Sequence, residues 1–332
     1  MIRKILTMFC LMFIWADISA QIIEQKEQDI KIFINDSAAR YVLENPVNAL
    51  KERDSIWNTF EGYRITHVWH EKSSYPITWE LWERGLDKFT NNDTSLITKS
   101  LKLINNISIL EKREHKKIEQ HLASYLPKTI SFNAYVYFIA FTIPYAFCVE
   151  QNKIGLEVTA DEWHFDSECL LNIMIHELYH VGYRLNSPDT TYLNSDPINN
   201  EQFINFNYAY MLSEGMATHV AYKALNLFPS NYKHDDYKLM EDEKNIKNAI
   251  GGINKLLEMT KTETVDTLYK KIWDIGVSQR AYYIAGAYMC KIIEEKFGTE
   301  YLAEIVSKGS LQFIKEYNVL VSDDYKINRV EL

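Results

Sequence analysis

Residues 176–180 read His-Glu-Leu-Tyr-His inside a run of apolar residues, and no other feature of the chain constrains the fold as much. A helix that is apolar on all sides is buried, so the motif is expected on a buried helix. Positions i and i+4 of a helix share a face, so His176 and His180 can direct both imidazoles at one point. Two imidazole nitrogens on one helical face are the pairing that a Zn²⁺ ion needs.

Burial of this motif requires partners, because each unpaired buried polar group costs about 1–3 kcal/mol. A metal ion satisfies His176, Glu177 and His180 together. Glu177 lies beside the metal, where its carboxylate can accept a proton from a metal-activated water. The sequence therefore predicts a zinc site with Glu177 as the general base.

A third zinc ligand is expected downstream, because a catalytic zinc usually has three protein ligands and one open position. Glu214 lies in a stretch predicted to be helical from about Phe206, and its small neighbours would let that helix approach the metal helix closely. Glu214 is therefore the expected third ligand, with Glu201 and His219 as rivals. Side chains that orient the histidines are left open among four candidates: Asp189, Asp196, Glu201 and Thr218.

These residues carry a resemblance to a known family. His176-Glu177-x-x-His180 followed by Leu212-Ser213-Glu214-Gly215-Met216-Ala217 resembles the gluzincin metallopeptidases, especially the neutral-aminopeptidase type, which carry Leu-Asn-Glu-Gly-Phe-Ala. Tyr283-Ile284-Ala285-Gly286-Ala287 is similar to their Tyr-x-Lys-Gly-Ala helix. The layout is also similar to that of uncharacterised zinc-dependent proteases of bacteria.

The resemblance implies zinc-dependent hydrolysis of peptide bonds in a peptide or protein substrate. It implies His176, His180 and Glu214 as metal ligands, Glu177 as the catalytic base, and Tyr283 as the hydrogen-bond donor to the oxyanion of the tetrahedral intermediate. Two nearby tyrosines are weaker candidates for the last role, namely Tyr282 and Tyr288.

Three departures separate the chain from the aminopeptidases. The spacing between His180 and Glu214 is longer, the Gly-x-Met-Glu-Asn strand that grips a free amino terminus is absent before the metal helix, and Ala285 replaces the lysine. The resemblance therefore implies zinc chemistry but not exopeptidase specificity. An idle zincin that binds peptides or proteins, and a zinc hydrolase acting on another substrate, remain alternatives.

The expected fold is α+β and mainly α, a zincin-like metallopeptidase with a small β-sheet beside the metal-binding helix. Strands are predicted at 134–142 and 153–159, as a hairpin or as two neighbours, and the second could offer its edge to an extended peptide. The metal helix is expected to begin at Asp166 or Ser167 and to end at Gly182. Helices over 236–320 should close the cleft and bring Tyr283 near the metal.

Three regions are predicted along the chain: a signal peptide over 1–20, an N-terminal helical region over 21–128, and a zincin-like catalytic domain over 129–332. Arg3 and Lys4 precede an apolar run, and Ile18-Ser19-Ala20 is a plausible cleavage site. The expected location is therefore periplasmic or secreted, with an uncleaved anchor as the rival. No later apolar run is long enough to predict a membrane span in the mature chain.

Composition excludes two other classes of protein. The formal net charge is −9, so the chain is a poor candidate for binding nucleic acid. Three cysteines remain beyond the signal segment, too few for a disulfide scaffold; they are expected as buried free thiols or as one bridge plus a thiol.

Overall fold

The computed structural model describes residues 29–72, 79–92, 94–128, 130–142, 145–160 and 166–328. The predicted signal peptide over 1–20 lies outside these residues. The described chain is mainly helical with one small sheet, which confirms the predicted fold class. None of its helices is long and apolar enough to cross a membrane. Cys148, Cys169 and Cys290 are buried free thiols.

The sheet has four strands in the order β1-β2-β4-β3. Its members are β1 (Asp29–Asn35), β2 (Ser131–Ile139), β3 (Ala146–Val149) and β4 (Lys153–Glu157). β1 and β4 each pair in parallel with β2, and β3 pairs antiparallel with β4. The predicted strands are thus neighbours, as β2 and β4, while the hairpin joins β3 to β4. β1 was missed, although its isoleucines alternate, because the region was interpreted as helical.

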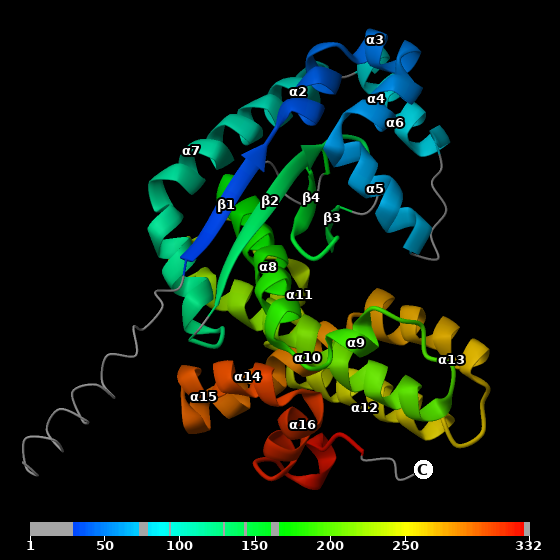
Figure 1. The fold of residues 1–332 in the computed structure, drawn as a ribbon, viewed down its shortest axis with the longest axis vertical. Coiled ribbons are helices and arrows are strands. Elements are labelled where there is room, and N and C mark those ends of the chain that lie inside the picture. The colour runs from blue at the N-terminus through cyan, green and yellow to red at the C-terminus, as the bar shows by residue number, and fades with distance from the viewer. Residues whose placement is uncertain are drawn as a thin grey trace, which may run out of the picture.

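Six helices come from the N-terminal part of the described chain, around one end and one side of the sheet (Figure 1). They are α2 (Ser37–Glu44), α3 (Pro46–Lys51), α4 (Arg53–Thr59), α5 (Glu61–Lys72), α6 (Trp79–Asn92) and α7 (Thr94–Ser124). The long α7 runs beside β1 (Figure 1), and the carboxylate of Glu119 on α7 accepts a hydrogen bond from the backbone N–H of Ile30.

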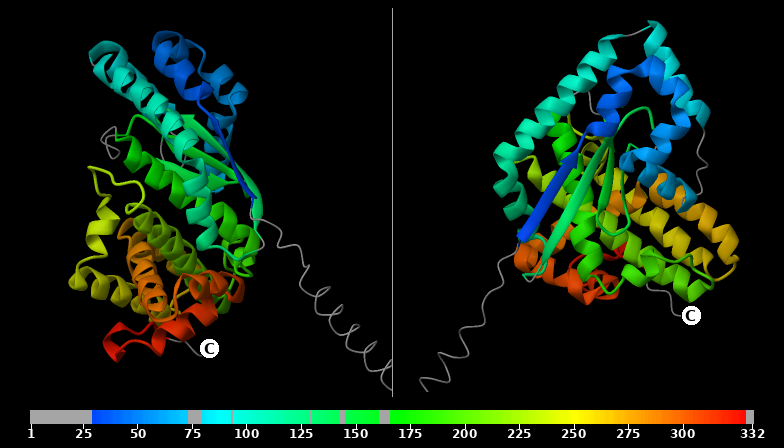
Figure 2. Two further views of the ribbon diagram at one scale, coloured as in Figure 1. Left: turned by 90° about the vertical axis from the view of Figure 1, so that its left-hand side faces the viewer. Right: turned by 45° about the horizontal axis from the view of Figure 1, so that its top comes forward.

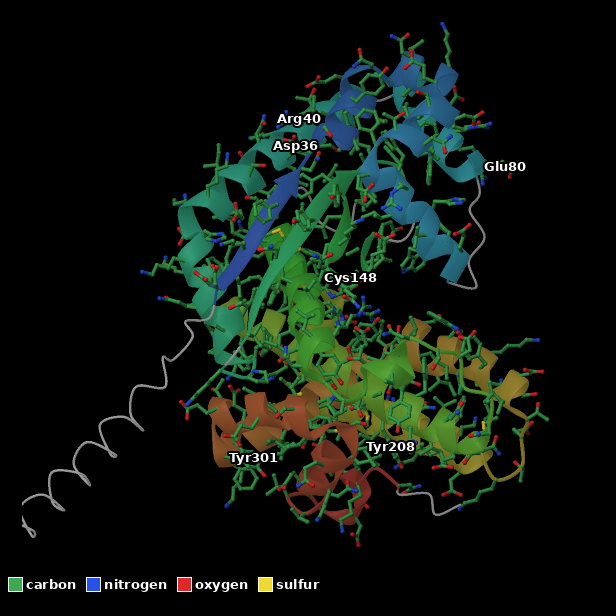
Figure 3. All side chains as sticks on the ribbon, viewed as in Figure 1. Asp36, Arg40, Glu80, Cys148, Tyr208 and Tyr301 are labelled. Carbon is green, nitrogen blue, oxygen red and sulfur yellow. The ribbon has the colours of Figure 1, made fainter. Side chains whose placement is uncertain are left out.

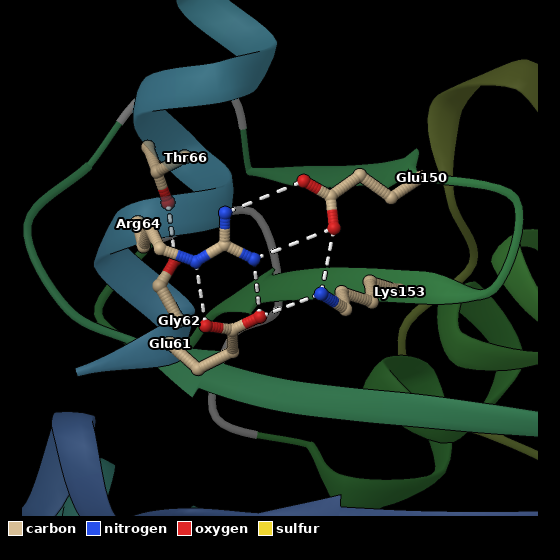
Figure 4. A network of polar contacts seen from close by, with 6 residues as sticks. All are labelled: Glu61, Gly62, Arg64, Thr66, Glu150 and Lys153. Atoms are coloured by element: carbon tan, nitrogen blue, oxygen red, sulfur yellow. Dashed lines mark hydrogen bonds and ion pairs between the residues drawn. The ribbon is translucent and has the colours of Figure 1, made fainter.

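Four charged side chains fasten α5 to the β3–β4 hairpin (Figure 4). Arg64 donates to Glu61 at 2.7 Å and approaches Glu150 at 3.4 Å. Lys153 completes the ring, with its Nζ 2.7 Å from Glu61 and 2.6 Å from Glu150. A network of this kind fixes geometry more firmly than an isolated surface pair does.

The metal helix is α8 (Ser167–Asn186), which lies between the sheet and the C-terminal helices (Figures 1 and 2). Asp166 caps it by accepting from the N–H of Cys169 at 2.9 Å, as predicted. The predicted end at Gly182 is wrong, because α8 continues to Asn186. Gly182 instead packs closely against α7 and the segment after it: a Cβ there would lie 2.4 Å from a methyl group of Leu126, which would have to shift.

The remaining elements form the C-terminal half of the molecule, below the sheet in Figure 1. They are α9 (Thr190–Leu193), α10 (Asn200–Ala224), α11 (Asp235–Leu239), α12 (Glu243–Met259), α13 (Val265–Lys271), the π-helix η2 (Ile272–Ser278), α14 (Ala281–Phe297), α15 (Thr299–Lys308), α16 (Ser310–Asn318) and the 3₁₀ turn η3 (Asp323–Tyr325). One hydrophobic core runs through both halves.

Candidate metal centre

Three side chains from two helices meet at one point. His176 and His180 on α8 bring their Nε2 atoms to 3.1 Å from each other. The Oε2 atom of Glu214 on α10 lies 3.3 Å from each of these nitrogens. Among the residues that the structure describes, this is the one group of at least three His, Cys, Asp or Glu side chains placed to hold a metal ion.

The triangle of donor atoms fits a zinc ion. Ligands at 2.0–2.1 Å in tetrahedral directions lie about 3.3 Å from one another, close to the three distances found here. Two imidazoles and one carboxylate are also a donor set found in catalytic zinc sites, which leave the fourth position open. The residues present therefore fit Zn²⁺.

Glu214 is buried and ionised. Burial by itself would raise the pKa of this carboxyl, but the charge of His180 and hydrogen bonds from both histidines outweigh it and lower the pKa well below its ordinary value. A buried carboxylate of this kind needs a cationic partner. The rivals for its role lie elsewhere: Glu201 is exposed at the start of α10, and His219 pairs with Glu294 at 2.9 Å.

Ser213 orients His180, and the sequence analysis did not name it for this role. Its Oγ lies 3.1 Å from Nδ1 of His180, the nitrogen turned away from Glu214. Among the predicted orienting residues, Asp189 accepts instead from the N–H of Ser310, and Asp196 accepts from the hydroxyl of Tyr269. The sequence did contain an indication of this role, because Ser213 directly precedes the expected ligand Glu214 on the same helix.

Glu177 is buried beside the cluster, with 7% of its surface exposed. Burial raises its pKa to about 7; repulsion from Glu214 adds to this, and attraction to His176 opposes it. A carboxyl group with a pKa near the working pH can both accept and return a proton.

Tyr283 on α14 lies next to the cluster. Its ring is nearly parallel to that of His176, with centroids 6.2 Å apart and planes inclined by 16°. Burial holds its pKa well above the ordinary value, so the phenol is a protonated hydrogen-bond donor. Tyr282 instead donates to Asn207, and Tyr288 packs against Tyr317 and Tyr325.

Arg280 fixes the position of Tyr283 and was also missed. Its guanidinium carbon lies 3.3 Å from the centre of the Tyr283 ring. The same guanidinium binds both carboxylate oxygens of the buried Asp236, at 2.8 and 2.5 Å. Arg280 has a positive φ of 61°, a strained conformation for a residue with a Cβ.

A cleft of about 800 Å³ opens beside the metal cluster. His180, Glu214 and Arg184 line it on one side, and Cys148 and Val149 of β3 on another. Figure 3 shows Cys148 where the sheet half faces the C-terminal helices. The predicted binding edge at 153–159 is wrong, because β4 is paired on both sides; β3 is the edge strand.

Residues 84–325 match a family model described as "Putative zinc dependent peptidase (DUF5700)". The chain belongs to this family. The match covers well over half of the chain and includes the residues of the metal cluster as well as Glu177, Arg184 and Tyr283. Zn²⁺ is the cofactor that the DUF5700 description and the donor set both support. No curated protein and no solved structure matches the chain.

Proposed function

We propose that this DUF5700 protein is an exported zinc metallopeptidase of the gluzincin type that hydrolyses peptide bonds, with His176, His180 and Glu214 as the zinc ligands. The observation that carries the proposal is the triangle of their donor atoms, with sides of 3.1–3.3 Å, beside an open cleft. The family description supports the substrate class.

Zinc, when bound, polarises the scissile carbonyl and makes a water molecule more acidic. Glu177 takes a proton from the attacking water at its carboxylate and delivers it to the nitrogen of the leaving amine. Tyr283 donates a hydrogen bond from its hydroxyl to the oxyanion of the tetrahedral intermediate. Arg280 holds the tyrosine ring in place.

The edge strand β3 supports a polypeptide substrate. β4 pairs with one side of β3 only; on the other side the carbonyl of Cys148 accepts from Arg184, and an extended peptide can pair with the remaining groups of such an edge. Cys148 and Val149 of β3 line the same cleft as His180 and Glu214. A peptide on this edge would therefore pass close to the metal cluster.

The decisive experiment is Glu177→Gln with a peptide library. The variant is expected to keep its zinc and lose hydrolysis, because an amide cannot act as the base. Glu201→Gln, the same change at an exposed position, is the control and should retain full activity. Retained hydrolysis in Glu177→Gln would refute the assigned role. Peptide binding by wild-type protein without turnover would instead favour the idle-zincin alternative, and hydrolysis confined to esters would favour a different hydrolase.

A further inference from the structure

Arg184 is one turn beyond His180 on α8 and belongs to the same helical face. The series 176, 180 and 184 advances by four residues each time, which keeps all three side chains on one side of the helix. Arg184 is half-buried and lines the cleft together with His180 and Glu214. A positive charge is thus built into the wall of the cleft, within reach of the metal cluster.

The guanidinium of Arg184 has no carboxylate partner among the described residues. Its Nη1 donates to the backbone carbonyl of Cys148 at 3.1 Å and lies 3.4 Å from the sulfur of that residue. This differs from the other arginines of the described ranges, which hold a carboxylate (Arg40, Arg53, Arg64, Arg113, Arg280) or are exposed (Arg84).

The acidic side chains that share the cleft are already engaged. Glu150 pairs with Arg64 and Lys153, Asp196 accepts a hydrogen bond from Tyr269, and Glu71 lies 3.2 Å from His67. Glu214 contacts both histidines of the metal cluster at 3.3 Å. Arg184 therefore forms no ion pair with these groups, and a planar guanidinium with N–H groups left over is suited to binding a carboxylate through two parallel hydrogen bonds.

The bond to Cys148 gives this guanidinium a fixed place. It ties the arginine to the edge strand that a peptide would follow, so little side-chain freedom remains to be lost when a ligand binds. Four residues of helix advance about 6 Å, and an extended peptide advances about 3.3 Å per residue. The group that Arg184 can reach therefore belongs to a residue close to the scissile bond.

We propose that Arg184 is a specificity-determining residue that binds a substrate carboxylate near the scissile bond. This inference rests on the proposed peptidase function and narrows its substrate class to peptides that carry a negative charge there. Two groups supply that chemistry: the α-carboxylate of a short C-terminal leaving fragment, and the side chain of Asp or Glu.

The test uses zinc-loaded full-length protein and matched peptides. One pair differs only in a free or amidated C-terminus, and a second pair, amidated in both members, differs only in Glu or Gln next to the cleaved bond. Wild-type protein should prefer the charged member of one pair by about tenfold to a hundredfold in kcat/KM, mainly through KM. The pair that shows the preference identifies the source of the carboxylate.

Arg184→Gln should lose the preference, so that its kcat/KM is the same for the charged and the neutral member of each pair, and Arg184→Lys should keep part of the preference. A wild-type enzyme with no preference in either pair would overturn the inference, as would a preference unchanged in Arg184→Gln. Equal loss on charged and neutral peptides in both variants would also overturn it, because that result marks a purely structural anchor for β3.

Calorimetric binding of the same peptides to the Glu177→Gln protein separates this inference from the proposed function. If wild-type protein cuts no peptide, the peptidase proposal fails. Tighter binding of a charged peptide, abolished by adding Arg184→Gln, would still support the role of Arg184, and equal binding of charged and neutral peptides would refute it.

Discussion

The backbones of Gly215 and Gly286 touch where α10 crosses α14. A Cβ on Gly215 would lie 2.4 Å from the Cα of Gly286, and a Cβ on Gly286 would lie 2.3 Å from the carbonyl oxygen of Met211. Glu214 directly precedes the first glycine, and Tyr283 is one turn before the second. The contact therefore sets the distance between the third metal ligand and the tyrosine.

Gly215→Ala should destabilise the fold by about 1–3 kcal/mol, because the added methyl group meets backbone that cannot move aside. We expect a lower melting temperature and weaker zinc binding, since Glu214 shifts with its helix. Gly251→Ala on α12 is the control: nothing lies within 4 Å of its Cβ position, so the helix should gain up to about 1 kcal/mol. Equal stability in the two variants would contradict the close crossing.

Ser213→Ala should weaken zinc binding about tenfold, because His180 loses the partner that orients its ring. Competition with a chelator of known affinity measures the change. Ser307→Ala on α15 removes an exposed hydroxyl that contacts only the backbone carbonyl of Glu304 and should leave the affinity unchanged. An unaltered zinc affinity in Ser213→Ala would show that the 3.1 Å contact does not support the histidine.

Tyr283→Phe should lower kcat on peptide substrates by about 10²–10³-fold, with little change in KM or zinc content, because the lost donor acts on the oxyanion. Tyr288→Phe is the matched control. Its ring packs against Tyr317 and Tyr325 rather than His176, so activity should change by less than about twofold. A fully active Tyr283→Phe enzyme would remove the tyrosine from the mechanism.

Glu294 should govern part of the acid sensitivity of the fold. Burial alone would raise its pKa, but His219 and Lys223 outweigh that effect and hold the pKa below its ordinary value of 4.5. The resulting stability is present above pH 4.5 and is lost as pH falls below that value towards the folded-state pKa.

Glu294→Gln should therefore cost about 3 kcal/mol at pH 7, near the low end for a buried pair because Lys223 is partly exposed. Its melting temperature should fall less steeply than that of the wild type below pH 4.5. Glu300→Gln, an exposed carboxylate on the next helix, should follow the wild-type curve. If the melting temperatures of Glu294→Gln and wild type fell equally steeply below pH 4.5, ionisation of Glu294 would not contribute to the acid sensitivity of the fold.

The parts of the site that share one helix could be predicted, because local spacing determines them. His176, Glu177 and His180 follow from helical periodicity, and Glu214 followed from its small neighbours. The reason given for those neighbours was incomplete, since Gly215 serves the crossing with α14 rather than an approach to α8. The small residues predicted a close contact between helices, but they did not indicate which helix α10 contacts.

The parts that depend on distant pairing could not be predicted. β1 was missed because its partner β2 lies about a hundred residues away, and strand propensity alone was weighed against helical neighbours. Arg280 gave no signal, because Asp236 and Tyr283 meet it only after α11 and α14 have packed. The free edge was predicted at β4 instead of β3, because the short strand 146–149 was not recognised.

The charged ring between α5 and the β3–β4 hairpin (Figure 4) has a mechanical consequence for the cleft. Trp69 and Glu71 at the end of α5 border the cleft, and so does Glu150, a member of the ring. Because Arg64 and Lys153 hold these segments together, a displacement of α5 would carry the hairpin with it. The width of the cleft thus depends on the position of α5 as well as on the zinc-binding helix.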